Sequence, residues 1–142
     1  MILLDTNVLS ELMRPQPSAQ VMNWLDRQPA ASLWISAITR AEIELGIALL
    51  PSGKRKQALA DTAEAMFSED FEGHCLPFDG QAAGHYAVIV SRRSLLGKPI
   101  TIEDAQIAAV ARSNELTLAT RNKKDFGGIE GLMIIDPWKH EE

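Results

Sequence analysis

Four acidic side chains stand at positions where α/β proteins commonly carry out chemistry. Asp5 directly follows the short apolar run at residues 2–4, which is typical of a strand buried on both faces. Glu42 and Asp104 each lie near the start of a segment with helical periodicity, and Asp125 lies in the loop after a later apolar run. Because ligands of open α/β sheets bind just beyond the carboxyl ends of the strands, we expect these acids at one edge of a sheet.

Carboxylates gathered at one place favour a bound cation. Two carboxylates about 4 Å apart repel each other by roughly 4 kcal/mol at an effective dielectric constant of about 20. A group of them therefore holds protons or cations, and ligands that are all oxygen suit hard ions such as Mg²⁺ or Mn²⁺. Such a centre can activate water and stabilise developing charge in phosphodiester hydrolysis. The candidate metal site consists of Asp5, Glu42, Asp104 and Asp125.

Each acid also has a structural interpretation. Thr39 and Glu42 have the three-residue spacing of a helix capping box, and Thr101 and Asp104 come close to it. An acid in a first helical turn gains about 0.3–1 kcal/mol from the helix dipole. The acid in the loop could equally be an ordinary turn residue or the cap of a short helix. Asp5 is harder to explain in this way, because an acid that ends an apolar strand has no capping duty beyond the next turn.

The segments between the acids alternate between strand-like and helix-like patterns. Short apolar runs predict strands at residues 2–4, 32–36, 74–78, 116–119 and 132–135, and Pro77 places the third at an edge or strand end. Apolar residues at helical spacing predict helices at residues 6–13, 19–28, 37–50, 54–67, 81–96 and 102–114, with Ser18 as the cap of the second and a loop over 120–128. This alternation indicates βα units with a mainly parallel sheet. We expect one domain over residues 1–142.

Composition narrows the class of protein. Apolar residues make up 46% of the chain and charged residues 23%, as in ordinary globular domains, and the formal net charge is −5. This acidic balance argues against a protein that coats nucleic acid by charge alone, but it is compatible with a nucleic-acid enzyme whose acids are neutralised by metal. No apolar run approaches a membrane span, and the N-terminus lacks the pattern of a secretion signal. We therefore expect a cytoplasmic protein in which the lone Cys75 is a small buried residue.

Four segments resemble the successive motifs of the PIN-domain nucleases. They are Leu4-Asp5-Thr6-Asn7, Ser36-Ala37-Ile38-Thr39-Arg40-Ala41-Glu42, Asp104-Ala105-Gln106-Ile107-Ala108-Ala109 and Ala119-Thr120-Arg121-Asn122-Lys123-Lys124-Asp125-Phe126. The segments occur in the family's order, and the resemblance covers essentially the whole chain. In particular, they look like those of the VapC toxins of bacterial type II toxin–antitoxin modules, in the FitB-like branch. One such motif is weak, whereas four in order at this chain length are specific.

The resemblance implies a PIN-like three-layer α/β/α domain with a central, mainly parallel five-stranded sheet. It implies metal-dependent endonucleolytic cleavage of RNA with Mg²⁺ or Mn²⁺, leaving a 5′-phosphate and a 3′-hydroxyl. Asp5 and Asp104 match direct metal ligands, Glu42 matches an acid that acts through water or at a second position, and Asp125 matches the most variable acid. The residues that match polar supports of these carboxylates and of the attacking water are Thr6, Thr120 and Asn122.

Basic residues flank the motifs and are candidate contacts for substrate phosphates. They are Arg40, Arg121, Lys123 and Lys124. By contrast, the basic runs at residues 54–56 and 92–93 are expected to be solvated helix surface. The three histidines show no metal-ligand spacing and are given no role, namely His74, His85 and His140.

The family resemblance also implies partners. Relatives of this type form homodimers, and an antitoxin from the same operon covers the active site with its C-terminal segment. In the FitB-like branch the complex binds operator DNA, which the antitoxin recognises. The apolar residues of the first two helices either form part of the antitoxin groove or pack on the sheet. They are Leu9, Leu12, Met13, Val21, Trp24 and Leu25.

The sequence therefore predicts a cytoplasmic, metal-dependent endoribonuclease that is the toxin of a toxin–antitoxin module. The alternative is a PIN-like domain with little activity of its own, acting as a partner in an antitoxin-containing, DNA-binding regulatory complex. Two other enzyme classes fit less well. A haloacid-dehalogenase-type phosphatase needs a second Asp where this chain has Asn7, and a receiver domain needs further acids near the first strand.

Overall fold

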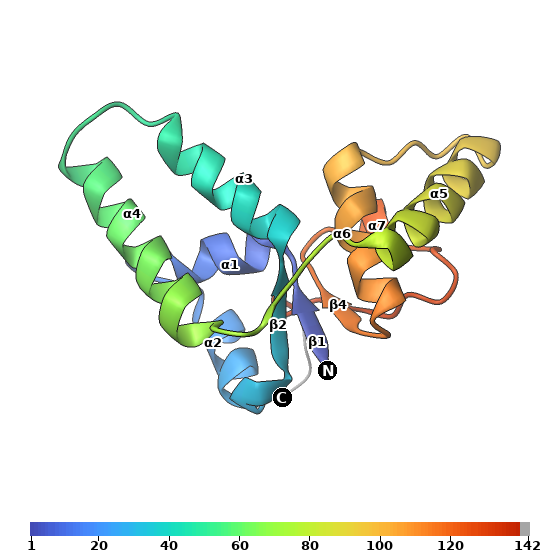
Figure 1. Cartoon of the computed structure of the whole chain (residues 1–142). Helices are drawn as coiled ribbons and strands as arrows, with labels where there is room; N and C mark the ends of the chain where they lie inside the picture. Colours follow the sequence, from blue (N-terminus) through green and yellow to red (C-terminus); the bar gives the residue numbers. More distant parts are fainter. Residues whose placement is uncertain (140–142) are drawn as a thin grey trace.

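Five parallel strands form one sheet in the computed structural model, which describes residues 1–139 (Figure 1). Their order is β3-β2-β1-β4-β5, so β1 lies at the centre. The bounds are Ile2–Leu4 (β1), Leu33–Ser36 (β2), Cys75–Leu76 (β3), Thr117–Ala119 (β4) and Ile134–Ile135 (β5). The predicted parallel five-stranded sheet is confirmed, with β3 at an edge and with strands shorter than several of the apolar runs. His140 lies outside the described residues.

Helices connect the consecutive strands, and the ends of the six predicted helices lie within two residues of the predicted ones. The first connection holds α1 (Thr6–Leu12), α2 (Ala19–Asp26) and the 3₁₀ turn η1 (Ala30–Ser32). The second holds α3 (Ala37–Ala48), α4 (Lys54–Ala65) and the π-helical turn η2 (Met66–Asp70). The third holds α5 (Gly80–Leu95) and α6 (Ile102–Ser113), and the fourth holds α7 (Lys123–Phe126). None of the described helices combines the length and the apolar composition that a membrane crossing requires.

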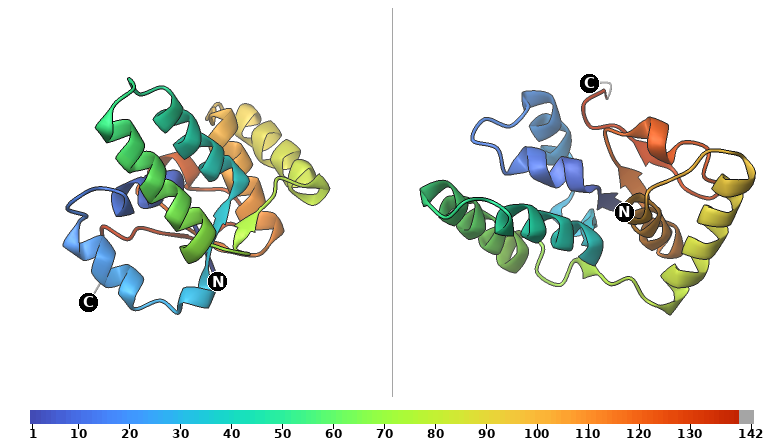
Figure 2. Two further views of the ribbon diagram at one scale, coloured as in Figure 1. Left: turned by 60° about the vertical axis from the view of Figure 1, so that its left-hand side comes forward. Right: turned by 90° about the horizontal axis from the view of Figure 1, so that it is seen from above.

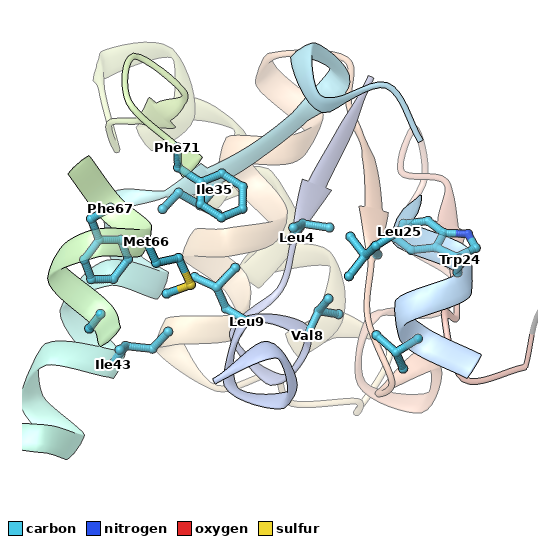
Figure 3. Packing of buried hydrophobic residues seen from close by; sticks show 13 residues of the cluster. Leu4, Val8, Leu9, Trp24, Leu25, Ile35, Ile43, Met66, Phe67 and Phe71 are labelled. Atoms are coloured by element: carbon cyan, nitrogen blue, oxygen red, sulfur yellow. The ribbon is translucent and has the colours of Figure 1, made fainter. Parts of the chain in front are cut away.

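Alternate side chains of the central strands face two separate cores. Leu4 and Ala119 face a first core built with α1 to α4, whereas Leu3 and Leu118 face a second core built with α5, α6 and α7. This alternation follows from the two-residue pleat of a strand. Figure 3 shows Leu4 among side chains of the first core. Figures 1 and 2 show α3 and α4 on the opposite side of the sheet from α5 and α6, so the predicted three-layer arrangement is confirmed.

Thr101 has the helix-capping role expected from the sequence, whereas Glu42 has none. Ser36, rather than Thr39, is the N-cap of α3, and its hydroxyl oxygen accepts a hydrogen bond from the Thr39 N–H over 3.1 Å. Glu42 consequently lies in the second turn of the helix, so the capping-box interpretation of Thr39 and Glu42 is wrong. Thr101 is the N-cap of α6, where its hydroxyl oxygen accepts from the Asp104 N–H at 3.2 Å.

Three local predictions were wrong. The segment 120–128 contains the helix α7 instead of a plain loop, because the fully buried Phe126 anchors it in the second core. Arg93, expected at solvated helix surface, is only 7% exposed and donates hydrogen bonds to backbone carbonyls of neighbouring segments. Cys75, expected to be buried, is exposed on the edge strand β3.

Replacing a leucine of the second core and a leucine of the surface tests the assignment of that core. Leu118 is fully buried in β4, whereas Leu49, the C-cap residue of α3, is 76% exposed. Leu118→Ala should lower the free energy of unfolding by about 2–5 kcal/mol because it leaves a cavity. Leu49→Ala should change it by less than about 0.5 kcal/mol. Urea denaturation followed by circular dichroism measures both, and equal losses would mean that the second core is wrongly assigned.

Candidate active site

The strand register brings Asp5 beside Thr120. β1 pairs with β4 so that Leu4 lies opposite Ala119, and the Asp5 N–H donates to the Ala119 carbonyl over 2.9 Å. Asp5 and Thr120, the residues that follow this pair, therefore lie side by side at the ends of the two strands. The chain adds β2 and β3 on one side of β1, and β4 and β5 on the other. Asp5 consequently stands at the switch point of the sheet, where open α/β folds bind ligands.

Hydrogen bonds fix the buried Asp5 carboxylate, whose residue is 3% exposed. Oδ1 accepts from the Thr6 N–H at 2.8 Å. Oδ2 accepts from the Thr120 hydroxyl at 2.7 Å and from the Asn7 side-chain amide at 3.2 Å. The Thr120 oxygen itself accepts from the Asn7 amide at 3.3 Å and from the Asn122 N–H at 3.0 Å. With both donors pointing at that oxygen, the Thr120 hydroxyl proton is directed at Asp5.

Burial raises the pKa of Asp5 from 3.8 to about 6. Loss of solvation is the largest cause, and the negative charges of Asp104 and Glu42 add to it. The hydrogen bonds from the Thr120 hydroxyl and the Thr6 N–H act in the opposite direction and lower the pKa. At neutral pH the carboxylate is therefore ionised in an environment that disfavours its charge, and a nearby cation would relieve this cost.

A chain of hydroxyl groups connects Glu42 to the end of β2. The Thr6 hydroxyl donates to Oε1 of Glu42 over 2.8 Å, and the Thr6 oxygen lies 3.0 Å from the Thr39 hydroxyl oxygen. Because Thr6 gives its proton to Glu42, Thr39 donates to Thr6. Thr39 is fully buried and accepts in turn from the Ser36 hydroxyl at 3.4 Å. Side chains of both α1 and α3 thus determine where Glu42 points.

Three of the four predicted acids line one cavity. It has a volume of about 500 Å³, and Asp5, Glu42 and Asp104 contribute to its wall. Loss of solvation raises the pKa of Asp104, and the negative charges of Asp125 and Glu103 raise it further. Asp125 itself is exposed on α7 and does not line the cavity. The structure therefore brings Asp125 within electrostatic reach of Asp104 but not to the cavity wall.

The chemistry of the cavity fits a hard divalent cation. Its acidic ligands supply only oxygen, and neither His nor Cys lines it. Among residues 1–139, no group of three or more His, Cys, Asp or Glu side chains already has the geometry of a metal centre. Asp5, Glu42 and Asp104 all line this cavity, and the repulsion of the Asp5 carboxylate by Asp104 and Glu42 is the physical reason why a cation between them would be favoured.

Of the predicted phosphate contacts, only Arg121 lines the cavity. Its guanidinium carbon lies 4.9 Å from the centroid of the Trp138 ring, in a cation–π contact. Arg40 instead forms an ion pair within α3, while Lys123 and Lys124 are exposed on α7. Among the predicted basic residues, Arg121 is therefore the one that lies in the cavity with the acids.

Sequence reasoning assigned no role to five further cavity residues. They are Asn7, Ser10, Glu11, Arg14 and Trp138. Asn7, Ser10 and Glu11 lie at helical spacing on one face of α1, and Arg14 continues this spacing just after the C-cap residue Met13, which is the signal that could have found them. The Ser18 N–H and the Arg14 guanidinium hold the pKa of the Glu11 carboxyl below its usual range. Trp138 carries no such signal, because it reaches the cavity from the other end of the chain.

An α/β sheet with an acidic cavity at its switch point defines the general class of this protein, and comparisons identify its family. A family model described as PIN domain matches residues 2–131. Toxin FitB of Neisseria gonorrhoeae is 44% identical over 138 residues, covering 97% of this chain and 99% of the toxin. The VapC ribonuclease Y4jK of Sinorhizobium fredii is 40% identical over 139 residues, covering 98% of this chain and 99% of the ribonuclease.

The fold comparison agrees with the sequence comparison. The solved structure of FitAB bound to an IR36 DNA fragment aligns with a TM-score of 0.92 at 43% identity, covering 100% of this chain and 99% of the matched chain. The chain belongs to the PIN-domain family.

The raised pKa of Asp5 predicts how stability depends on pH. The folded protein keeps the Asp5 proton up to about pH 6, whereas the unfolded chain releases it near pH 3.8. The folded state therefore binds more protons in this window, so Asp5 lowers the stability as the pH rises from about 4 to about 6. A pKa difference of about two corresponds to about 3 kcal/mol.

Asp5→Asn should remove this contribution. The free energy of unfolding is measured by urea denaturation in EDTA at pH 4 and at pH 7. Between these pH values the wild type should lose about 3 kcal/mol more than Asp5→Asn does. Asp26→Asn, at an exposed position of α2, controls for the change of net charge. Parallel pH profiles of wild type and Asp5→Asn would contradict the assignment.

Proposed function

We propose that this protein is a metal-dependent endoribonuclease that acts as the toxin of a toxin–antitoxin module, with residues 1–142 as one PIN domain. The observation that carries the proposal is the buried, hydrogen-bonded Asp5 in one cavity with Glu42 and Asp104. The PIN-domain match and the names of the similar proteins, a VapC ribonuclease and toxin FitB, support it.

The roles follow from the positions of the side chains. Asp5 and Asp104 are proposed to hold Mg²⁺ or Mn²⁺, and Glu42 and Asp125 to complete the acidic site at longer range. A divalent cation there supplies a Lewis acid, which stabilises charge developing on a phosphodiester and favours the ionised form of an attacking water. The chain itself fixes the carboxylate directions through the hydroxyls of Thr6 and Thr120.

Basic side chains are proposed to hold the RNA backbone. Arg121 and Arg14 line the cavity with the acids, and a guanidinium can donate two parallel hydrogen bonds to one phosphate. The Trp138 ring under Arg121 limits the freedom of that guanidinium, which reduces the entropy lost when phosphate binds. The Asn122 N–H is committed to Thr120, so Asn122 acts on the carboxylate through its backbone.

An apolar groove of about 760 Å³ adjoins the active site. It is lined by α1, α3 and α4, and it shares Thr6 and Glu42 with the acidic cavity. A second hollow of about 750 Å³ continues it toward α2 and η2, with Leu12 and Met13 at the junction. We propose that the antitoxin segment lies in this groove, since an apolar chain there would end at the catalytic acids.

The groove is not built from the whole set of apolar residues predicted for it. Leu12 and Met13 line it and Leu25 lines its continuation, whereas the other members are buried in the first core. Those buried members are Leu9, Val21 and Trp24. Packing on the sheet therefore explains most of α2, and α3 and α4 supply the opposite wall of the groove.

Further partners belong to the same proposal. A homodimer is supported by exposed apolar side chains around the connection of α5 and α6, where Leu95, Leu96 and Ile102 are 88%, 66% and 62% exposed. Operator DNA would be reached through the antitoxin, because a net charge of −5 disfavours direct binding to DNA. The proposed location is the cytoplasm, where the RNA substrate is found.

Loss of cleavage in single-acid variants tests the enzyme. A mixed pool of structured RNA is incubated with purified protein in Mg²⁺, in Mn²⁺ or in EDTA. We expect discrete cuts that require metal and that fall by at least about 100-fold in Asp5→Asn and Asp104→Asn, because each variant removes a proposed metal ligand worth several kcal/mol. Denaturing gel electrophoresis measures the cuts.

Glu103→Gln is the matched control, since the exposed Glu103 adjoins Asp104 without lining the cavity, and this variant should lower cleavage far less than either acid variant. Cleavage that survives in EDTA or in both acid variants would indicate a contaminating nuclease. Absence of cleavage in every sample, together with no Mg²⁺ binding by calorimetry, would reject the enzyme and favour the catalytically weak regulatory partner.

Filling the groove tests the antitoxin site. Gly46 of α3 lines the groove, and a Cβ added there would meet no heavy atom within 4 Å. Gly46→Leu should therefore leave the fold intact and obstruct the groove. The added side chain should overpack the groove at a cost of about 1–3 kcal/mol, so the cognate antitoxin should bind at least about tenfold more weakly. Calorimetry measures this affinity.

Ala41→Leu adds the same side chain to an exposed position of α3 outside the groove and should bind like wild type. Equal affinities of the two variants for the antitoxin would exclude the groove as its site.

A further inference from the structure

Arg93 is a charged side chain buried away from the proposed catalytic cavity. It lies in the last turn of α5, and its residue is only 7% exposed. In the part of the chain that the structure describes, no carboxylate forms an ion pair with it. Its guanidinium instead donates to the backbone carbonyls of Lys98, Asp125 and Gly127. A buried guanidinium is costly unless its donors are used, so these contacts strongly favour one arrangement of the surrounding backbone.

The carbonyls come from two segments that lead to acids of the proposed site. Lys98 belongs to the connection before α6, whose first turn carries Asp104. The Asp125 and Gly127 carbonyls belong to the end of α7 and the residue after it. The Lys98 N–H also returns a hydrogen bond to the Arg93 carbonyl over 2.9 Å. One side chain thus joins the backbone of the segment before Asp104 to that of the helix that carries Asp125.

The α7 segment has little freedom to compensate for the loss of this contact. It is a single short helix of four residues, and the Gly127 N–H closes it by donating to the Lys123 carbonyl over 2.7 Å. A Cβ added at Gly127 would lie 2.8 Å from that carbonyl oxygen, so only glycine fits the turn without movement. The negative charge of Asp125 already acts on Asp104 across this junction.

We propose that Arg93 is a positioning residue that holds Asp125 in reach of the Asp104 side of the acidic site and so sets the affinity for the divalent cation. The proposal rests on the proposed metal-dependent function. Arg93 touches neither substrate nor cation and acts through the Asp125 and Lys98 backbone. A guanidinium is required because its planar fork can donate in several directions at once, which the single ammonium of lysine cannot reproduce.

Arg93→Ala and Arg93→Lys test the proposal, and Arg92→Ala is the matched control. Arg92 precedes Arg93 on the same helix but is exposed and pairs with the exposed Glu130. Outer residues that orient ligands commonly change metal affinity by about 10–100-fold. We therefore expect both Arg93 variants to bind Mg²⁺ at least about tenfold more weakly by calorimetry, and to need correspondingly more Mg²⁺ for half-maximal RNA cleavage.

Hydrogen exchange supplies a readout that needs neither cation nor RNA. The amides of Asp125, Phe126 and Gly127 should exchange at least about tenfold faster in the Arg93 variants, while amides of β1 and β4 keep wild-type protection. Added methylguanidinium should restore Mg²⁺ affinity to Arg93→Ala by occupying the vacated site. Should Arg93→Ala fail to fold, Arg93→Lys decides the outcome, because it disturbs the same junction more mildly.

Several results would overturn the proposal. One is a folded Arg93→Lys whose Mg²⁺ affinity and α7 exchange match those of Arg92→Ala. Another is an equal loss of protection throughout the protein with unchanged Mg²⁺ affinity, which would mean a general effect on stability. If wild type neither cleaves RNA nor binds Mg²⁺, the proposed nuclease function fails, while faster exchange confined to α7 would still establish that Arg93 positions this segment.

Discussion

The ionised carboxylate of Asp5 is the constraint around which this structure is built. It sits at the end of the central strand, nearly inaccessible to solvent, where the loss of hydration favours its neutral form. Folding tolerates it because three groups donate to it in fixed directions, and because the sheet on which it stands is held from both sides. Because this charge costs stability when no cation is near, Asp5 is suited to its proposed role as a metal ligand.

The two cores meet at this point, which explains why the acids come from elements far apart in the sequence. Asp5 and Glu42 lie on elements that pack in the first core, whereas Asp104 lies on α6, a helix of the second core. Both cores pack on the sheet, and β1 stands at its centre. The distance between Asp5 and Asp104 is therefore set by how each layer packs on the sheet. Mutations in either core can change the site without touching it.

The apolar run that Asp5 closes was enough to predict the position of this acid and the edge of the sheet where the candidate site lies. Parallel strands bring their carboxyl ends to one edge, so an acid that closes an apolar run indicates that edge from sequence alone. The chain also signals its helices well, since Ser18, Thr101 and the prolines mark their ends. The residue pattern could not predict which side chains point toward one another. Asn7 and Thr120 meet only because the register of β1 and β4 aligns them, and register depends on long-range packing.

The burial of Arg93 was the other feature that the local sequence pattern did not predict. Arg92 and Arg93 are adjacent, identical and basic, so any rule based on composition treats them alike. The helix turns one of them outward to Glu130 and the other inward to the carbonyls of α7. A rotation of about 100° per residue on a helix is enough to separate a solvated charge from a structural one. Which of the two faces inward is decided by the layer on which α5 packs.

The shared lining of the groove and the cavity has a consequence for how a partner could control the site. Thr6 and Glu42 belong to both hollows, and the Thr6 hydroxyl is the donor that directs Glu42. A peptide segment in the groove would therefore contact Thr6 and Glu42, whereas Thr39 and Ser36, further along the hydroxyl chain, are fully buried. In the proposed complex, such a segment need not enter the cavity to act on Glu42, because the Thr6 hydroxyl that donates to this carboxylate also lines the groove. Binding in the groove and the proposed chemistry in the cavity would in this sense form one coupled site, joined through the residues that line both hollows, namely Thr6, Ser10, Arg14 and Glu42.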